Sequence, residues 1–287
     1  MKLLRFGPAG SEKPDLLDAA GRVRDLSGEV GDITPASLSP ALLARLAALD
    51  PAALPRVDGA VRLGPPVGGV GKIICIGLNY RDHAEEAGMP VPGEPLLFMK
   101  SPTAIIGPDD PVVLPAGAQK GDWEVELAIV IGRKARLVAR GQAGEYIAGY
   151  SIMNDVSERA FQLEHGGQWV KGKSFDSFAP FGPWLVTGDE IGDPQSLDLW
   201  LDVNGTRRQT GNTATMIFDV FEIVSYVSRF MTLLPGDVIS TGTPPGVGMG
   251  HKPPLFLKAG DVMRLGITGL GEQRQEVAME TARGDRK

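Results

Sequence analysis

Residues 122–132 read DWEVELAIVIG. In an extended chain, the apolar residues at the start of this stretch point to one face, and Glu124 and Glu126 point to the other. The glutamate face then continues with Ala128 and Val130, which are apolar. The stretch therefore predicts a β-strand whose glutamate face is covered by protein, with two carboxylates that need a partner.

Like charges on one face of a strand repel each other unless water or a counter-ion screens them. A divalent cation is the strongest such counter-ion, and carboxylates without His or Cys nearby suit Mg²⁺, Mn²⁺ or Ca²⁺. A half-exposed sheet with a solvated acidic face is the alternative. Asp155 ends the apolar stretch GYSIMNDV (149–156), where it is either a third ligand or a helix-start residue, with Ser157 as the cap of a short helix running to Glu164.

The composition is that of a soluble globular protein: 287 residues, 43% hydrophobic and 22% charged, with a net charge of -6. No cluster of Lys and Arg provides an electrostatic footprint for nucleic acid. No signal peptide and no apolar run long enough to span a membrane are apparent, so we expect a cytoplasmic protein with no membrane partner. Cys75, the single cysteine, lies in an apolar run and is expected to be buried and inert.

Short apolar segments separated by 38 Gly and 23 Pro indicate a strand-rich fold. Residues 1–65 look like a small N-terminal unit, with strands folded at Ala20–Gly21 and a helix at 40–49. A second helix is expected up to Phe230, with Asn212 and Thr213 as capping candidates. The other strands are expected at 72–79, 123–131, 149–156, 197–203 (closed by an Asn204–Gly205 turn), 237–241 and 261–268.

Five polar side chains outside the acidic strand are further candidates. Arg159 and Gln162 share a face of the short helix after Asp155, where they could orient a substrate or form a surface salt link.

GQWVKGKS (167–174) matches the phosphate-loop pattern but lacks the preceding strand, so we reject that interpretation. Lys173 within it could hold an anion or be an exposed loop lysine. His83 and Glu86, three residues apart, form a candidate water-activating pair if their segment is helical, and a solvent-exposed helix is the alternative.

Two further expectations concern the remaining loops. The Gly/Pro loop 240–250 could present the Thr243 hydroxyl and backbone amides to an anionic ligand, or it could be a simple turn. His165 and His251 are expected at the surface.

Taken together, these segments resemble the fumarylacetoacetate hydrolase superfamily over about residues 71 to 270. The matching segments are GLNYRDHAEE, DWEVELAIVIG, AGYSIMNDVSERAFQ, KGKSFDSFAPFGPW, LDVNG, PGDVISTGTPPGVG and KAGDVMRLGITGLG. The resemblance implies a mostly-β fold with some α, built as a mixed β-sheet roll over residues 71–287, with a small α+β domain at 1–65 and a homodimeric assembly.

The resemblance also implies roles for individual residues. Glu124, Glu126 and Asp155 would bind one Mg²⁺ or Mn²⁺, His83 and Glu86 would activate water, and Lys173 would be catalytic. Arg159, Gln162 and Thr243 would bind substrate. The expected reaction is hydrolysis of a C–C bond in a small-molecule 2,4-dioxo acid, an acylpyruvate or a 2,4-dioxo-3-deoxy sugar acid, to pyruvate and a carboxylic acid.

Three alternatives stay open at this point. An isomerase or decarboxylase of related dioxo acids, or a ureidoglycolate lyase, could use the same metal site. A β-rich binding protein could retain the cation for structure alone. The His83–Glu86 pair favours hydrolysis, because isomerases and decarboxylases of the family need not keep a water-activating pair.

Overall fold

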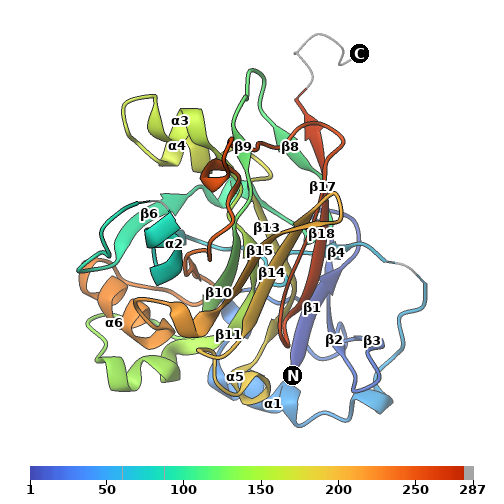
Figure 1. Ribbon diagram of the computed structural model, residues 1–287. Helices are drawn as coiled ribbons and strands as arrows, with labels where there is room; N and C mark the ends of the chain where they lie inside the picture. The colour runs from blue at the N-terminus through green and yellow to red at the C-terminus, as the bar shows by residue number, and fades with distance from the viewer. Residues whose placement is uncertain (60, 87, 281–287) are drawn as a thin grey trace.

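Two mixed sheets dominate the computed structural model, which describes residues 1–59, 61–86 and 88–280 (Figure 1). Within these residues, the large sheet has eleven strands: β1 (Lys2–Phe6), β2 (Lys13–Leu17), β3 (Val23–Asp25), β4 (Leu63–Gly64), β5 (Ile73–Gly77), β6 (Leu96–Lys100), β7 (Ile105–Ile106), β10 (Val125–Ile131), β11 (Ile147–Asn154), β13 (Ala179–Val186) and β16 (Val238–Ser240). The main order is β3-β2-β1-β13-β11-β10-β16-β5-β6, with β4 beside β1 and β7 beside β13.

The second sheet has five strands in the order β15-β14-β17-β18-β8. They are β8 (Val112–Leu114), β14 (Asp198–Val203), β15 (Thr206–Asn212), β17 (Val262–Ile267) and β18 (Gly271–Met279). β9 (Gly121–Asp122) and β12 (Ser157–Glu158) form a separate pair. In Figure 1, β14, β17 and β18 lie in front of β10, β11 and β13, and contacts between the two sheets enclose the core. The predicted mostly-β fold with some α is confirmed.

β10 lies in the middle of the large sheet, and all seven of its residues are buried. The predicted strand at 123–131 begins two residues later, at Val125. At the start of β10, side-chain oxygens rather than backbone carbonyls accept hydrogen bonds from the backbone amides. The Glu124 amide donates to Asn154 Oδ1 (3.1 Å), and the Val125 amide donates to Gln209 Oε1 (3.0 Å).

The helices lie at the edges of the sheets: α1 (Pro40–Ala47), α2 (Arg81–Glu86), α3 (Arg159–Leu163), α4 (Val170–Lys173), α5 (Gly188–Ile191) and α6 (Val220–Phe230). Two predicted caps are wrong. Asp219 caps α6 by accepting from the Glu222 amide (2.8 Å), whereas Asn212 caps a separate 3-10 turn. Glu158, not Ser157, caps α3, because its carboxylate accepts from the Phe161 amide (2.7 Å).

The two predicted hairpins are confirmed. β2 and β3 pair around Gly21, and β14 and β15 pair around Asn204–Gly205, where both turn residues have positive φ (52° and 74°). The proposed boundary between residues 65 and 71 stays a prediction. β1 pairs with β13 as well as β2, so the large sheet continues from the N-terminal segment into the remainder of the chain.

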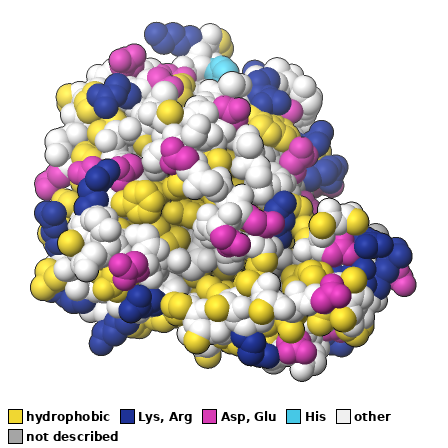
Figure 2. Space-filling view, turned by 90° about the horizontal axis from the view of Figure 1, so that it is seen from below, with side chains coloured by type: hydrophobic (Ala, Val, Ile, Leu, Met, Phe, Trp, Pro, Cys, Tyr) yellow, Lys and Arg dark blue, Asp and Glu magenta, His cyan; other side chains and the backbone are white. Residues whose placement is uncertain are grey.

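The surface carries charges of both signs. On the face shown in Figure 2, acidic and basic side chains lie interspersed among hydrophobic areas. In the ranges 1–59, 61–86 and 88–280, no helix combines the length and the apolar character needed to cross a membrane.

Candidate active site

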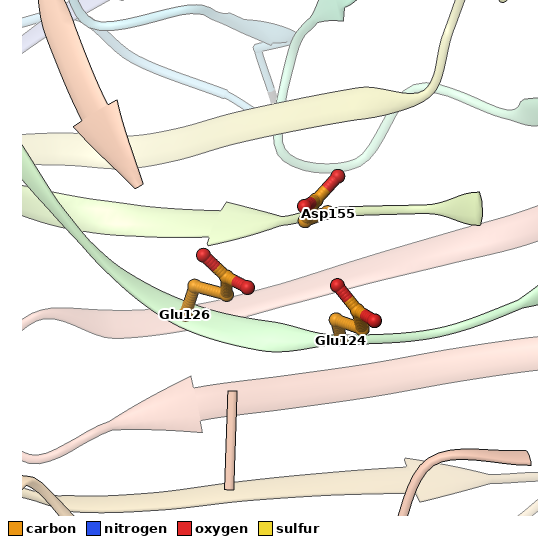
Figure 3. A group of neighbouring side chains, drawn as sticks. All are labelled: Glu124, Glu126 and Asp155. Atoms are coloured by element: carbon orange, nitrogen blue, oxygen red, sulfur yellow. The ribbon is translucent and has the colours of Figure 1, made fainter. Parts of the chain in front are cut away.

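Three buried carboxylates meet where β10 and β11 run side by side (Figure 3). Val125 lies opposite Asn154 in this pair, and the Asp155 amide donates to the Glu124 carbonyl (2.9 Å), so Asp155 lies beside the two glutamates. One oxygen from each of Glu124, Glu126 and Asp155 lies within 4.8 Å of the other two. The alternative interpretation, a half-exposed sheet with a solvated acidic face, is wrong, because Glu124 is 6% exposed and Glu126 is 2% exposed.

The donor set fits a hard divalent cation. Buried carboxylate oxygens without a nearby imidazole or thiolate ligand are what Mg²⁺ and Mn²⁺ prefer. Burial raises the pKa of Glu126 well above its usual range, and the charges of Asp155 and Glu124 raise it further. The carboxylates therefore repel each other even though basic side chains surround them.

Lys173 lies between two of these acids. Its ammonium donates to Glu124 Oε2 (2.6 Å) and to Asp155 Oδ2 (2.9 Å). The exposed-loop interpretation is wrong, because Lys173 is in α4 and is 2% exposed. Burial lowers its pKa, but Asp155 and Glu124 outweigh burial and raise the pKa above the usual value.

Lys100, at the end of β6, is a second buried lysine that the sequence did not single out. Its ammonium donates to Asp155 Oδ1 (2.5 Å) and to the Val156 carbonyl (3.0 Å). A lysine that ends the strand LLFMK has the same local pattern as an exposed strand-end lysine. Its partner is 55 residues away in the chain, so local sequence carried no signal for this pair.

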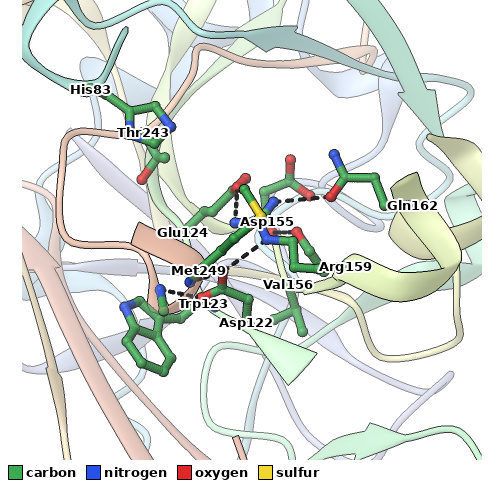
Figure 4. Close-up of polar contacts among 12 residues, drawn as sticks. His83, Asp122, Trp123, Glu124, Asp155, Val156, Arg159, Gln162, Thr243 and Met249 are labelled. Carbon is green, nitrogen blue, oxygen red and sulfur yellow. Dashed lines mark hydrogen bonds and ion pairs between the residues drawn. The ribbon is translucent and has the colours of Figure 1, made fainter. Parts of the chain in front are cut away.

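Arg159 holds one metal-ligand candidate in place (Figure 4). Its guanidinium donates to Asp122 Oδ2 (2.8 Å), Glu124 Oε1 (2.6 Å) and Gln162 Oε1 (3.0 Å). The alternative interpretation of Arg159 as part of a surface salt link is wrong, because this residue is 5% exposed. Burial acts to raise the pKa of Glu124, but the Lys173 ammonium and Arg159 guanidinium outweigh it and hold that pKa at about 2. Lys173 and Arg159 together thus keep Glu124 ionised, and Arg159 also orients the Gln162 amide.

Backbone amides of the predicted Gly/Pro loop bind three site carboxylates. Gly242 donates to Glu126 (2.9 Å), Gly246 donates to Glu86 (3.0 Å), and Gly248 and Met249 donate to Asp122 (2.6 and 3.0 Å). Gly246 has φ +100°, and a Cβ there would lie 1.9 Å from the Arg208 carbonyl oxygen. Only glycine fits this position, and the loop positions the protein's own acids.

The predicted His83–Glu86 pair forms on α2. His83 Nδ1 lies 3.1 Å from Glu86 Oε2, and Glu86 is fixed in turn by the Gly246 amide. This leaves the other ring nitrogen of His83 for a ligand, and His83 lines the same cavity as Glu124 and Glu126. The exposed-helix interpretation is wrong for His83, which is 9% exposed.

Thr243 also lines the cavity, but its hydroxyl is engaged with protein groups. It donates to the Val125 carbonyl (2.9 Å) and accepts from Gln209 Nε2 (2.8 Å).

His165 is exposed as expected, and His251 is half-buried rather than a surface residue. Cys75 is fully buried, and this burial raises the pKa of its thiol.

The cavity that unites these groups has a volume of about 200 Å³. Its polar lining consists of His83, Glu124, Glu126, Arg159, Gln162, Lys173 and Thr243. Of the nine candidate residues from the sequence, Glu86 and Asp155 lie just behind this lining and contact residues within it.

Comparison with known proteins agrees with this arrangement. A family model described as "Fumarylacetoacetate (FAA) hydrolase C-terminal" matches residues 72–278. The chain belongs to the fumarylacetoacetate hydrolase family. A protein from Burkholderia cenocepacia, named "Putative hydrolase", is 62% identical to this chain over 276 residues. The match covers 96% of this chain and 98% of that protein.

Solved structures of the fumarylacetoacetate hydrolase family share the complete fold. A fumarylacetoacetate hydrolase from Exiguobacterium antarcticum has a TM-score of 0.87 and 40% identity, covering 98% of this chain and 100% of that one. Maleylpyruvate hydrolase from Sphingobium sp. SYK-6, in complex with manganese(II) and pyruvate, has a TM-score of 0.81 and 32% identity with the same coverage. A 2-hydroxyhepta-2,4-diene-1,7-dioate isomerase from Mycobacterium marinum has a TM-score of 0.75 and 35% identity, also with the same coverage.

Proposed function

We propose that this member of the family is a Mg²⁺- or Mn²⁺-dependent hydrolase of 2,4-dioxo acids. It would cleave the C3–C4 bond of an acylpyruvate and release pyruvate and a carboxylic acid. The observation that carries the proposal is that His83, with Glu86 behind it, lines the same cavity as Glu124, Glu126 and Lys173. A site that binds an oxo-acid substrate and has a base beside it suits the attack of water on that substrate.

Glu124, Glu126 and Asp155 would hold the cation. Bound there, a divalent cation supplies Lewis-acid polarisation of a 2-oxo acid, which stabilises negative charge on its oxygens. The likeness to maleylpyruvate hydrolase, which was solved with manganese(II) and pyruvate, supports this assignment.

The protein's own groups would perform the proton transfers and stabilise charge. Glu86, held by the Gly246 amide, fixes the His83 ring so that its free nitrogen takes a proton from water. The water oxygen adds to C4, the C3–C4 bond breaks, and C3 of the departing pyruvate enolate takes up the proton that His83 removed from water. The Lys173 ammonium stabilises the negative charge that develops on the enolate oxygen.

An isomerase of related dioxo acids is the second candidate, and the likeness to the Mycobacterium marinum isomerase favours it. The two proposals differ in one product, because isomerisation releases no pyruvate. A homodimer, as the resemblance implies, stays a prediction that light scattering of the purified protein tests.

The deciding experiment measures pyruvate release from acylpyruvates and dioxo sugar acids, with added Mg²⁺ or Mn²⁺ and with chelator. Oxaloacetate, which gives pyruvate by decarboxylation, and ureidoglycolate, which gives none, are tested in parallel by loss of substrate. The proposal expects metal-dependent pyruvate release that His83→Ala suppresses. Pyruvate-free turnover of a dioxo acid would replace the hydrolase with the isomerase.

A further inference from the structure

The cavity wall beyond the polar groups is apolar. Its larger side chains come from segments far apart in the chain: Leu78, Met89, Phe98, Leu163, Trp169 and Met249. Met89 follows α2, Leu163 ends α3, and Trp169 precedes α4, so the apolar wall surrounds the same space that the catalytic groups face.

The aromatic part of this wall begins directly beside Lys173. The Lys173 ammonium lies 5.1 Å from the centre of the Phe98 ring, and Trp169 packs edge-on against Phe98 with ring centres 5.3 Å apart. Trp169 also lies against Gly77, where an added Cβ would come within 2.9 Å of its ring. A substrate group that extends from the reacting carbons past Lys173 therefore meets aromatic carbon.

The cavity is unsuited to a second negative charge on the substrate. Of its described lining residues, only Arg159 and Lys173 carry a permanent positive charge. Arg159 is paired with Asp122 and Glu124, and Lys173 is paired with Glu124 and Asp155. A terminal carboxylate on the acyl group would be desolvated without a free cation to receive it.

Hydroxyl groups would be disfavoured for a related reason. A polyhydroxylated acyl group against Leu78, Phe98 and Leu163 would lose hydrogen bonds with water and gain none from these side chains. An alkyl or aryl group in the same place would bury apolar surface.

Building on the proposed function, we propose that the preferred substrates are acylpyruvates with an uncharged alkyl or aryl acyl group. Dicarboxylic and sugar-acid 2,4-dioxo acids would be poor substrates. The apolar wall defined above would be the acyl subsite and would set this specificity.

Matched substrate pairs test this proposal on the intact protein with Mg²⁺. Propanoylpyruvate and 5,6-dihydroxy-2,4-dioxohexanoate differ only in two hydroxyls, and butanoylpyruvate and succinylpyruvate differ only in a terminal carboxylate for a methyl. The apolar member of each pair should have a kcat/KM higher by about tenfold or more. From acetyl- to hexanoylpyruvate, kcat/KM should rise by about three- to fourfold for each CH₂ that enters the subsite.

Leu163→Asn tests the subsite without removing a buried core residue, because Leu163 is 43% exposed. The preference for hexanoyl- over acetylpyruvate should fall by about tenfold. Leu234→Asn is the matched control, since Leu234 is 46% exposed and does not line the cavity. An unchanged preference in Leu163→Asn, or a higher kcat/KM for the sugar acid or succinylpyruvate, would overturn the proposal.

A binding measurement separates this proposal from the hydrolase itself. By calorimetry with Mg²⁺, 2-oxohexanoate should bind at least about tenfold more tightly than 2-oxoadipate, which has the same six carbons and a second carboxylate. Absence of pyruvate release from every substrate together with this order of affinity would contradict the hydrolase and support the apolar subsite. Tighter binding of 2-oxoadipate would contradict the subsite whatever the reaction is.

Discussion

The Lys100 ammonium lies 2.5 Å from Asp155 Oδ1, and both side chains are fully buried. Burial lowers the pKa of Lys100, while the charge of Asp155 opposes that effect. Lys173 approaches the other Asp155 oxygen at 2.9 Å and lines the cavity, whereas Lys100 does not. Asp155 is thus held between two ammonium groups, one facing the cavity and one behind it.

Lys100→Met should destabilise the protein, because it leaves Asp155 buried with one of its two ammonium partners missing. Removal of one partner from a buried ion pair typically costs about 3–5 kcal/mol, and we expect the free energy of unfolding in urea to fall by roughly that amount. Lys120→Met removes a partly exposed lysine paired with Glu164 and should cost less than about 1 kcal/mol. Equal effects of the two substitutions would contradict a structural role for the Lys100–Asp155 pair.

Metal binding should release a proton and become tighter as the pH rises. The pKa of Glu126 is raised by burial and by the negative charges of Asp155 and Glu124, so a proton competes with the cation for this carboxylate. Calorimetry of Mg²⁺ or Mn²⁺ binding in buffers of different ionisation enthalpy measures the released proton. Glu126→Gln should abolish the release and weaken binding, and a wild-type affinity that is constant between pH 5 and 8 would speak against this coupling.

His83→Ala should lower kcat by about 10²- to 10⁴-fold, because it removes the base that takes a proton from water. Cation affinity should not change, since His83 makes no hydrogen bond with Glu124, Glu126 or Asp155 in the described structure. Glu86→Gln should lower kcat less, because the His83 ring remains in the cavity but loses the carboxylate that orients it. A His83→Ala enzyme with the wild-type kcat would remove the His83–Glu86 pair from the mechanism.

Asp15 should make the protein less stable as the pH rises. Its carboxyl is fully buried on β2 opposite Asp25, neither oxygen has a hydrogen-bond partner among the described residues, and burial followed by the Asp25 charge raises its pKa to about 8. The folded state keeps the carboxyl protonated, whereas the unfolded chain ionises near 3.8. The contribution of Asp15 to stability is therefore most favourable below the unfolded pKa and is lost as the pH rises toward 8.

Asp15→Asn should remove most of this pH dependence. In urea unfolding at pH 5 and pH 8, the loss of stability between the two should shrink by roughly 2–4 kcal/mol. Asp58→Asn, at an exposed position, is the control and should leave the loss unchanged. A loss in Asp15→Asn equal to the wild-type loss would show that other groups cause it.

The parts of the site that depend on local pattern could be predicted from the sequence. Alternation places Glu124 and Glu126 on one face, and helical spacing joins His83 to Glu86. Lys100 and Asp122 were missed because their functions arise from partners that are distant in the chain. The α6 cap was misplaced because Asn212 and Asp219 are both good capping residues, and only the fold decides between them.

The place of β1 in the large sheet has a consequence for synthesis on the ribosome. The β10–β11 pair, with its three acids, can form once residue 155 has emerged, but Leu3 must wait for its partner Leu185. Ser240, which donates to Glu126 (2.6 Å), arrives later still. A nascent chain would thus carry the paired β10 and β11 strands while Lys2 and Leu3 of β1 still lack their β13 partners, and this interval is when chaperone protection would matter most.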